Sequence, residues 1–418
     1  MCNGTIMDKL ISFSIPLMLS GILQLMFNAV DIVVVGRFSG SQALAAVGST
    51  TALINVFTNL FIGISLGANV LAARYYAAGK TKEMSETVHT AIALALVSGV
   101  AMAVIGVVFA RGALEIMGTP DDVIAKSTLY MRIYFCGMPF FMMYNYGAAI
   151  LRAVGDTKRP LIFLIVSGVI NAVLNLFLVI GFHLDVAGVG IATVISQLVS
   201  CILVLRCLHH TESSYQLHLA KLRIRSVYLK QIFEVGVPAG IQSTVINISN
   251  AMLQSSVNSF GSIAMAGYTA SNNIFGFLYV SVNSFTQACM SFTSQNYGVK
   301  KLKRMDRVLI DCMILSVVVT LILGSSVYIF GPELLHIYSN QADVIKYGME
   351  IFSYTTVTYF LCGLMDLFPG ALRGMGYSTV PMILSIIGTV GVRIIWIYGL
   401  FPFTQITDFL VSVLSGIL

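Results

Sequence analysis

Apolar runs of about 20 residues, the length an α-helix needs to cross the hydrocarbon core of a bilayer, recur along this whole sequence. Hydrophobic residues make up 57% of the 418 residues and charged residues only 10%, against roughly 25% charged residues in soluble globular domains. A soluble core could not bury that much apolar surface, which excludes a soluble protein, and the same composition excludes a disordered chain and a disulfide scaffold. We therefore expect an all-α polytopic membrane protein.

The apolar runs predict eleven full-length membrane helices and a shortened twelfth. Their predicted ranges are residues 10–36, 42–73, 88–110, 130–151, 160–182, 187–208, 230–258, 264–292, 308–331, 347–372, 381–402 and 406–418. One long connection, residues 209–229, predicts a linker between an N-terminal six-helix bundle (1–208) and a C-terminal bundle (230–418) with a short last helix.

The two halves of the sequence repeat. LRAVGDTKRP at 151–160 returns as LRGMGYSTVP at 372–381, with Leu, Arg, Gly and Pro shifted by 221 positions, and Pro16 answers Pro238 at a shift of 222. Six helices per unit would give both halves the same orientation, so the repeat is expected to be parallel. Two bundles related in this way are a transporter architecture, with the binding site between them.

Positive charge is biased to one side of the predicted membrane. Of the 24 Lys and Arg residues, 18 fall at the N-terminus or in connections on the side of the linker, five fall on the other side, and Arg393 lies within a helix. The positive-inside rule then places the N-terminus and the linker in the cytoplasm. We interpret the net charge of +6 as this topology signal and expect no nucleic-acid partner.

Polar residues follow one face of three predicted helices, at helical spacing. The predicted cavity-lining residues are Gln24 and Asn28 in the first helix, Asn247, Asn250 and Gln254 in the seventh, and Asn272, Tyr279, Asn283 and Gln287 in the eighth. Polar groups in hydrocarbon are costly, so they should face the protein interior or a wet cavity. Such stripes also join membrane helices by hydrogen bonds. Both interpretations stay open, and we favour a cavity lining.

Asp31 is the only acidic residue well inside a helix of the first half. Desolvation favours the neutral form of a carboxylate, so Asp31 is a candidate for taking up and releasing a proton. The alternatives are an ion pair with Arg37 and an interfacial position. In the second half, Asp366 and Arg393 suggest a buried pair. His89 stands at a predicted helix end, where a solvated histidine is the usual case.

No chemical motif points to an enzyme. The sequence has no Walker phosphate loop, zinc spacing or nucleophile elbow. Its seven cysteines show no CxxC spacing and are expected to be packing residues. We expect no catalytic residue, no bound metal and no cofactor.

Several segments resemble the multidrug and toxic compound extrusion (MATE) transporters. They include IPLMLSGILQLMFNAVDIVVVGRFSG, GISLGANVLAARYYAAGK, LRAVGDTKRPL and VGVRIIWIYG, so the resemblance covers nearly the whole chain. It implies drug efflux coupled to inward flow of protons or sodium. Asp31 matches the family's coupling acid in helix one, and Pro16 matches the proline at which that helix bends, with Pro238 as its counterpart.

The resemblance also assigns neighbours to Asp31. Asn171 and Thr193 match polar residues grouped around the acid in proton-coupled members. Asn175 stands where many members have a second Asp, and the Glu that some sodium-coupled members carry on helix seven is absent. The coupling ion, H⁺ or Na⁺, is therefore left open.

The sequence thus predicts a monomeric, multi-pass exporter in the plasma (inner) membrane of a prokaryote, working by alternating access on small amphiphilic, often cationic compounds. Its partners are these substrates and the lipid bilayer. One rival is a lipid-linked precursor flippase of the same wider superfamily, which should prefer a strongly basic cavity. A channel or receptor scaffold is the second, and the parallel repeat argues against it.

Overall fold

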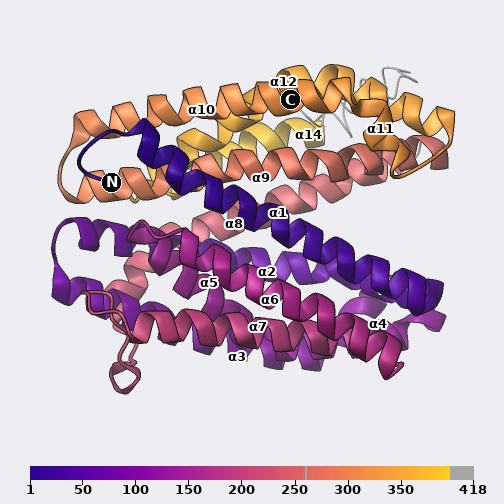
Figure 1. Ribbon diagram of the computed structural model, residues 1–418, viewed down its shortest axis with the longest axis horizontal. Coiled ribbons are helices and arrows are strands. Elements are labelled where there is room, and N and C mark those ends of the chain that lie inside the picture. The colour runs from indigo at the N-terminus through magenta and orange to yellow at the C-terminus, as the bar shows by residue number, and fades with distance from the viewer. Residues whose placement is uncertain (259–260, 396–418) are drawn as a thin grey trace.

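The computed structural model describes residues 1–258 and 261–395, and this part of the chain is helical (Figure 1). In chain order the α-helices are α1 (Met7–Phe38), α2 (Gly40–Ala77), α3 (Thr81–Ile116), α4 (Asp121–Cys136), α5 (Met138–Ala153), α6 (Lys158–Leu176), α7 (Asp185–His209), α8 (Ser226–Asn258), α9 (Ser262–Gly298), α10 (Leu302–Ile329), α11 (Gly331–His336), α12 (Ala342–Gly374), α13 (Thr379–Ser385) and α14 (Val392–Ile394). Short π-helical segments follow α6 (Phe177–Gly181) and α13 (Ile386–Gly391), and a 3-10 turn lies at Leu219–Lys221. The predicted twelfth helix, 406–418, lies outside the described residues.

Seven of the described helices are long and apolar enough to cross a membrane. The helices α8 and α9 are not among the seven, because their polar stripes lower their hydropathy. Most observed helices extend beyond their predicted ranges at both ends. Hydropathy marks only the part of a helix that lies in hydrocarbon, whereas helical hydrogen bonding continues into the polar flanks.

The predicted fourth helix, 130–151, is wrong in both its start and its continuity. It begins at Asp121, nine residues earlier, where two acidic residues in the first turn stabilise the positive end of the helix dipole. It is also divided into α4 and α5 at Gly137, because Pro139 in the first turn of α5 supplies no N–H for the helix before it. The helix α8 begins at Ser226, so the connection from α7 runs over 210–225 and is shorter than predicted.

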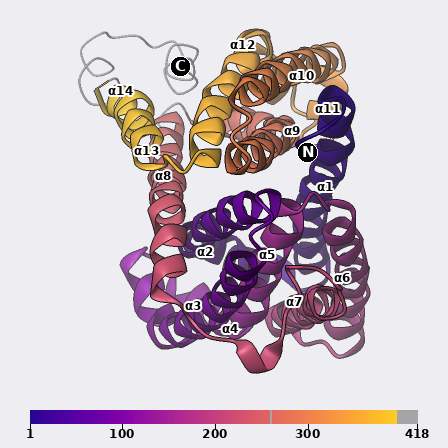
Figure 2. The ribbon, with the colours of Figure 1, turned by 90° about the vertical axis from the view of Figure 1, so that its left-hand side faces the viewer.

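The helices form two bodies, with α2 to α7 in one and α9 to α14 in the other (Figures 1 and 2). The repeat is visible in the backbone. Residues with a positive backbone φ recur at a spacing of 221 positions: Gly40 with Gly261, Gly79 with Lys300, and Gly155 with Gly376. A positive φ is rare outside glycine, so three matched pairs are independent evidence that the two halves share one chain path.

The first helix of each half crosses from one body to the other (Figure 2). In α1, Leu10 and Phe13 belong to a buried cluster with Phe292 of α9, whereas Phe27 packs against Gly168 of α6. The helix α8 does the reverse, since Ile232 lies in the core of the N-terminal body and Leu253 in that of the C-terminal body. Any movement between the bodies must therefore change the packing of α1 and α8.

The crossing of α2 and α8 is very close. Glycines occur four residues apart on both helices, as Gly63 and Gly67 on α2 and Gly236 and Gly240 on α8. A Cβ placed on Gly63 would lie 2.2 Å from the Cα of Gly240. Small residues at this spacing let membrane helices approach backbone to backbone.

One end of the molecule carries residues 1–6, 78–80, 154–157, 210–225, 299–301 and 375–378, and we call it the linker face (Figures 1 and 2). Near this face the two bodies are joined by hydrogen bonds. The Arg74 guanidinium donates to the Met375 carbonyl at 2.9 Å and lies over the Tyr297 ring, 4.9 Å from its centroid. Gln295 donates to the Ala153 carbonyl at 2.6 Å. The bodies are closed on each other at the linker face.

Candidate cation-coupling site

Asp31 lies in the C-terminal half of α1, where α1 packs along α6, and its side chain is half-buried. The side-chain amide of Asn175 on α6 donates a hydrogen bond to Asp31 Oδ1. The same amide also donates to Asn171 Oδ1, one turn earlier on α6, at 3.2 Å. Asn175 is fully buried and Asn171 is 5% exposed. The three side chains therefore form one connected polar cluster inside the N-terminal body.

Thr193 of α7 donates its hydroxyl to the Val189 carbonyl of its own helix, at 2.9 Å. The structure thus joins Asp31, Asn171 and Asn175 directly and gives Thr193 a backbone partner. Among the described residues no ion pair links Asp31 to Arg37, which is exposed at the end of α1. The ion-pair alternative for Asp31 is therefore wrong.

Two tyrosines of α4, which are not among the residues predicted from the sequence, complete the surroundings of Asp31. Tyr130 is buried and Tyr134 half-buried, and both lie near enough to interact electrostatically with the Asp31 carboxylate. Their spacing of one turn was the available signal. Aromatic residues at helical spacing are more often plain core residues, so the signal was ambiguous.

The predicted cavity-lining residues are exposed or half-buried in the described structure. Gln24, Asn28, Asn247, Asn250, Asn272 and Tyr279 are exposed, whereas Gln254, Asn283 and Gln287 are half-buried. Some of these side chains form hydrogen bonds within their own helix. Gln287 donates to Asn283 Oδ1 at 2.6 Å in α9, and Asn247 donates to the Ser243 carbonyl at 2.9 Å in α8. Their role as a cavity lining stays a prediction.

Asp366 and Arg393 do not form the suggested pair. Arg393 donates to Asn250 Oδ1 at 2.7 Å and to Ser249 Oγ at 3.3 Å, both on α8. The cation near Asp366 is Arg373, in the last turn of α12, which itself donates to Gln242 Oε1 at 2.5 Å. The suggested pair between Asp366 and Arg393 is therefore wrong, because the fold gives each residue a different neighbour.

The two predicted hinges lie inside unbroken helices. Pro16 is buried in α1, and the Ser20 hydroxyl donates to its carbonyl at 2.7 Å. Pro238 lies in α8 beside a surface hollow at the linker face, whose lining includes Phe233, Glu234 and Tyr377. No group of three His, Cys, Asp or Glu side chains in the described part of the chain could hold a metal ion.

A model of one protein family, MatE, matches residues 16–177 and again residues 238–398. The chain belongs to the MatE family. The two matches start at Pro16 and Pro238, 222 positions apart, which agrees with the internal repeat.

Relatives of this MatE protein carry names of drug exporters. The chain is 29% identical to the "Probable multidrug resistance protein YoeA" of Bacillus subtilis (strain 168), covering 94% of this chain and 87% of that protein. It is 23% identical to the "Multidrug export protein MepA" of Staphylococcus saprophyticus, covering 97% and 90%. A solved structure described as the outward-facing conformation of a multidrug resistance MATE family transporter of the MOP superfamily superposes with a TM-score of 0.92, at 20% identity, over 99% of this chain and 92% of that one. The last likeness establishes the fold.

Proposed function

We propose that this MatE protein is an exporter of small amphiphilic, often cationic compounds, driven by inward flow of protons or sodium across the plasma membrane. The linker face is cytoplasmic in this proposal, in line with the charge bias. The bodies, closed at that face, then represent a state closed to the cytoplasm. The protein works as a monomer by alternating access, and the coupling ion is its only required inorganic partner.

The observation that carries the coupling role is the hydrogen bonding of Asn175. Its amide nitrogen serves both Asp31 and Asn171, while its buried carbonyl oxygen has no hydrogen-bond partner among the described residues. A buried acceptor without a partner costs about 1–3 kcal/mol. A proton on Asp31, or a cation beside it, would supply the missing donor or positive charge. Uptake of the ion therefore stabilises the cluster and also neutralises the carboxylate.

Neutralisation changes how α1 interacts with both bodies. The C-terminal half of α1 is tied to α6 through Asp31, and its N-terminal half packs against α9 around Phe13. A change in the first contact is thus transmitted along one helix to the other body. Pro16 is the point at which the ladder of helical hydrogen bonds is already interrupted, so α1 bends there most easily.

The direct test is export of a fluorescent cationic dye from proteoliposomes containing the purified protein. A proton gradient and a sodium gradient are imposed separately. Export under one of the two gradients, abolished by its collapse, supports the proposal and names the ion. Movement of a lipid-linked precursor in place of dye, with neither gradient required, would favour the flippase.

A further inference from the structure

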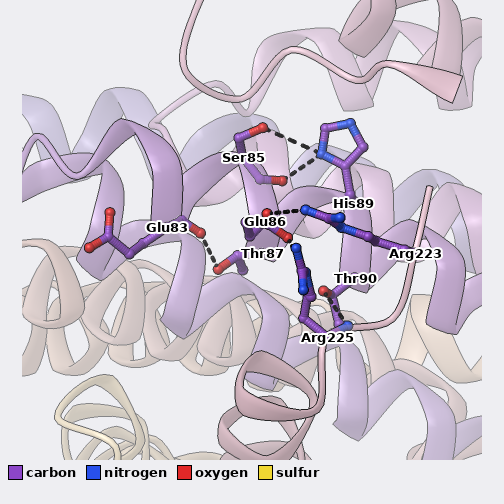
Figure 3. Close-up of polar contacts among 8 residues, drawn as sticks. All are labelled: Glu83, Ser85, Glu86, Thr87, His89, Thr90, Arg223 and Arg225. Carbon is purple, nitrogen blue, oxygen red and sulfur yellow. Dashed lines mark hydrogen bonds and ion pairs between the residues drawn. The ribbon is translucent and has the colours of Figure 1, made fainter. Parts of the chain in front are cut away.

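The linker between α7 and α8 is docked on α3. The Glu86 carboxylate accepts from Arg223 Nη2 at 2.6 Å and from Arg225 Nε at 3.1 Å, one oxygen for each arginine (Figure 3). The backbone N–H of Arg225 donates to the Thr90 hydroxyl at 3.3 Å. Glu86, His89 and Thr90 lie at i, i+3 and i+4, so they share one face of α3.

His89, between these two contacts, is not the solvated histidine expected from the sequence, since it is only 3% exposed. Its Nδ1 lies 2.6 Å from the Ser85 carbonyl, and its Nε2 lies 3.1 Å from the backbone nitrogen of His218 in the linker (Figure 3 shows the Ser85 side). A carbonyl only accepts and a backbone N–H only donates. Nδ1 must therefore carry the proton, and Nε2 must offer a lone pair.

This arrangement accepts only the neutral imidazole. A second proton would occupy Nε2, remove the acceptor for His218, and set two N–H groups against each other. The His218 ring is also stacked on the His89 ring, with centroids 6.2 Å apart and planes 11° apart, so a charge on both rings would be repulsive. Histidine is the side chain that changes charge in the physiological pH range.

The groups around the contact are mostly cationic. His218 is surrounded by His89 of α3, His209 of α7 and Lys221 of the linker, and its pKa is lowered by desolvation first and then by these charges. Glu86 is surrounded by Arg223 and Arg225 of the linker and by Tyr228 of α8. Glu83 has two tyrosine neighbours, Tyr75 of α2 and Tyr228. The lowered pKa of His218 favours its neutral ring, and the docked geometry likewise requires a neutral ring at His89.

The docked linker leads directly into α8. Arg225 is followed at once by Ser226, the first residue of α8, and Tyr75 of α2 donates to Gln231 at 2.9 Å and packs edge-on against Tyr228. The first turns of α8 are thereby held on the N-terminal body. Since α8 continues into the core of the other body, a docked linker restrains movement between them.

We propose that the docked linker is a pH-sensitive restraint on the movement of the two bodies, released when the pH at the linker face falls and His89 takes up a proton. The free linker allows His89 to bind this proton and the docked linker does not. Because docking and a second proton on His89 exclude each other, the docking equilibrium weakens as the pH falls from 7.5 to 5.5. This inference concerns the linker alone, so its test does not depend on the proposed export activity.

The test is residue-resolved hydrogen exchange of the full chain in nanodiscs at pH 5.5, 6.5 and 7.5, with rates corrected for the intrinsic pH dependence of exchange. The amides of His218 and Arg225 report docking. Their protection should fall about tenfold from pH 7.5 to pH 5.5 in the native sequence. Equal protection at all three pH values would overturn the proposal.

Three variants separate His89 from its neighbours. His89→Gln cannot titrate and should show protection that does not change with pH. His218→Gln keeps the backbone N–H and should retain the native pH dependence. Glu86→Gln should lower protection at every pH without changing the dependence. A pH dependence that persists in His89→Gln, or that disappears only in His218→Gln, would contradict the assignment.

His89→Gln could prevent docking altogether, so the ring itself is also measured. Nitrogen NMR of histidine-labelled native protein should find His89 with the proton on Nδ1 at pH 7.5. The ring should become protonated over the same pH range in which the His218 amide loses protection. A ring that stays neutral to pH 5.5, or an Nε2–H tautomer at pH 7.5, would overturn the proposal without any variant.

Discussion

Asn175 on α6 donates its side-chain amide to the carboxylate of Asp31 on α1, and thereby joins the helix shared by both bodies to the interior of one of them. The sequence separation of this pair is 144 residues. The contact is therefore a product of the fold and not of neighbouring positions in the sequence.

Removing the donor should weaken coupling without unfolding the protein. In Asn175→Leu the carboxylate loses its hydrogen bond, and a hydrogen bond to a charged group contributes about 1.5–3 kcal/mol. We expect gradient-driven dye export to fall about tenfold or more. Asn145→Leu is the matched control, because Asn145 donates only to the Phe141 carbonyl of its own helix. Equal losses in the two variants would show that the effect is not specific to the Asp31 contact.

The α2–α8 crossing should not tolerate a side chain. A Cβ at Gly240 would lie 2.4 Å from the Leu60 carbonyl oxygen, a backbone atom that cannot rotate away. Gly240→Ala should therefore lower stability by about 1–3 kcal/mol, measured as a lower midpoint of thermal unfolding. Gly112→Ala is the control, since no atom lies within 4 Å of its Cβ position and alanine favours the helix. A midpoint unchanged in Gly240→Ala would mean that the helices are not in backbone contact.

Arg74 should hold the linker face closed. Arg74→Ala removes its hydrogen bond to Met375 and its contact with the Tyr297 ring, which together are worth ~1–3 kcal/mol. Labelling of a Ser294→Cys reporter, buried between the bodies, should accelerate roughly five- to hundredfold. Lys80→Ala, whose ammonium lies 6.0 Å from the Tyr75 ring centroid within the N-terminal body, should leave the rate unchanged. Acceleration by both variants would indicate general loosening.

The linker face should be cytoplasmic. With Cys2, Cys136, Cys207 and Cys362, the four cysteines that are not buried, replaced by Ser, a Ser213→Cys thiol in the linker should be labelled by an impermeant reagent only after the cells are opened. Asn340→Cys, exposed in the connection before α12, should be labelled in intact cells. The reverse pattern would overturn the orientation and, with it, the direction of transport.

The helices and their repeat could be predicted from the sequence because both depend on local patterns. Hydropathy locates the apolar part of a helix, and a motif such as LRAVGDTKRP fixes a turn whose glycine, Gly155, needs a positive φ. The division of the fourth helix at Gly137 was missed because the apolar run continues through it. The helix ends in polar flanks could not be predicted because the apolar run stops before the helix does.

The site was predicted only in part. Asp31 and Asn175 could be predicted from their polarity in an apolar helix and from the family resemblance. The hydrogen bond between their side chains could not be predicted. Tyr130 and Tyr134 come from a helix distant in sequence, and their register against α1 is set by packing. His89 was expected to be solvated, because nothing local to α3 indicates that residues 218–225 fold back over it.

In the proposed mechanism Asp31 couples dye export to an ion gradient, and the Asp31→Asn variant removes that charge alone. Asparagine keeps the size and polarity of the side chain but cannot be charged. Asp31→Asn should fold and bind dye, yet lose gradient-driven export in proteoliposomes. Asp8→Asn, an exposed carboxylate in the first turn of the same helix, should retain it. Export by Asp31→Asn at the native rate, under the same imposed gradient, would show that the Asp31 carboxylate does not couple export to the ion.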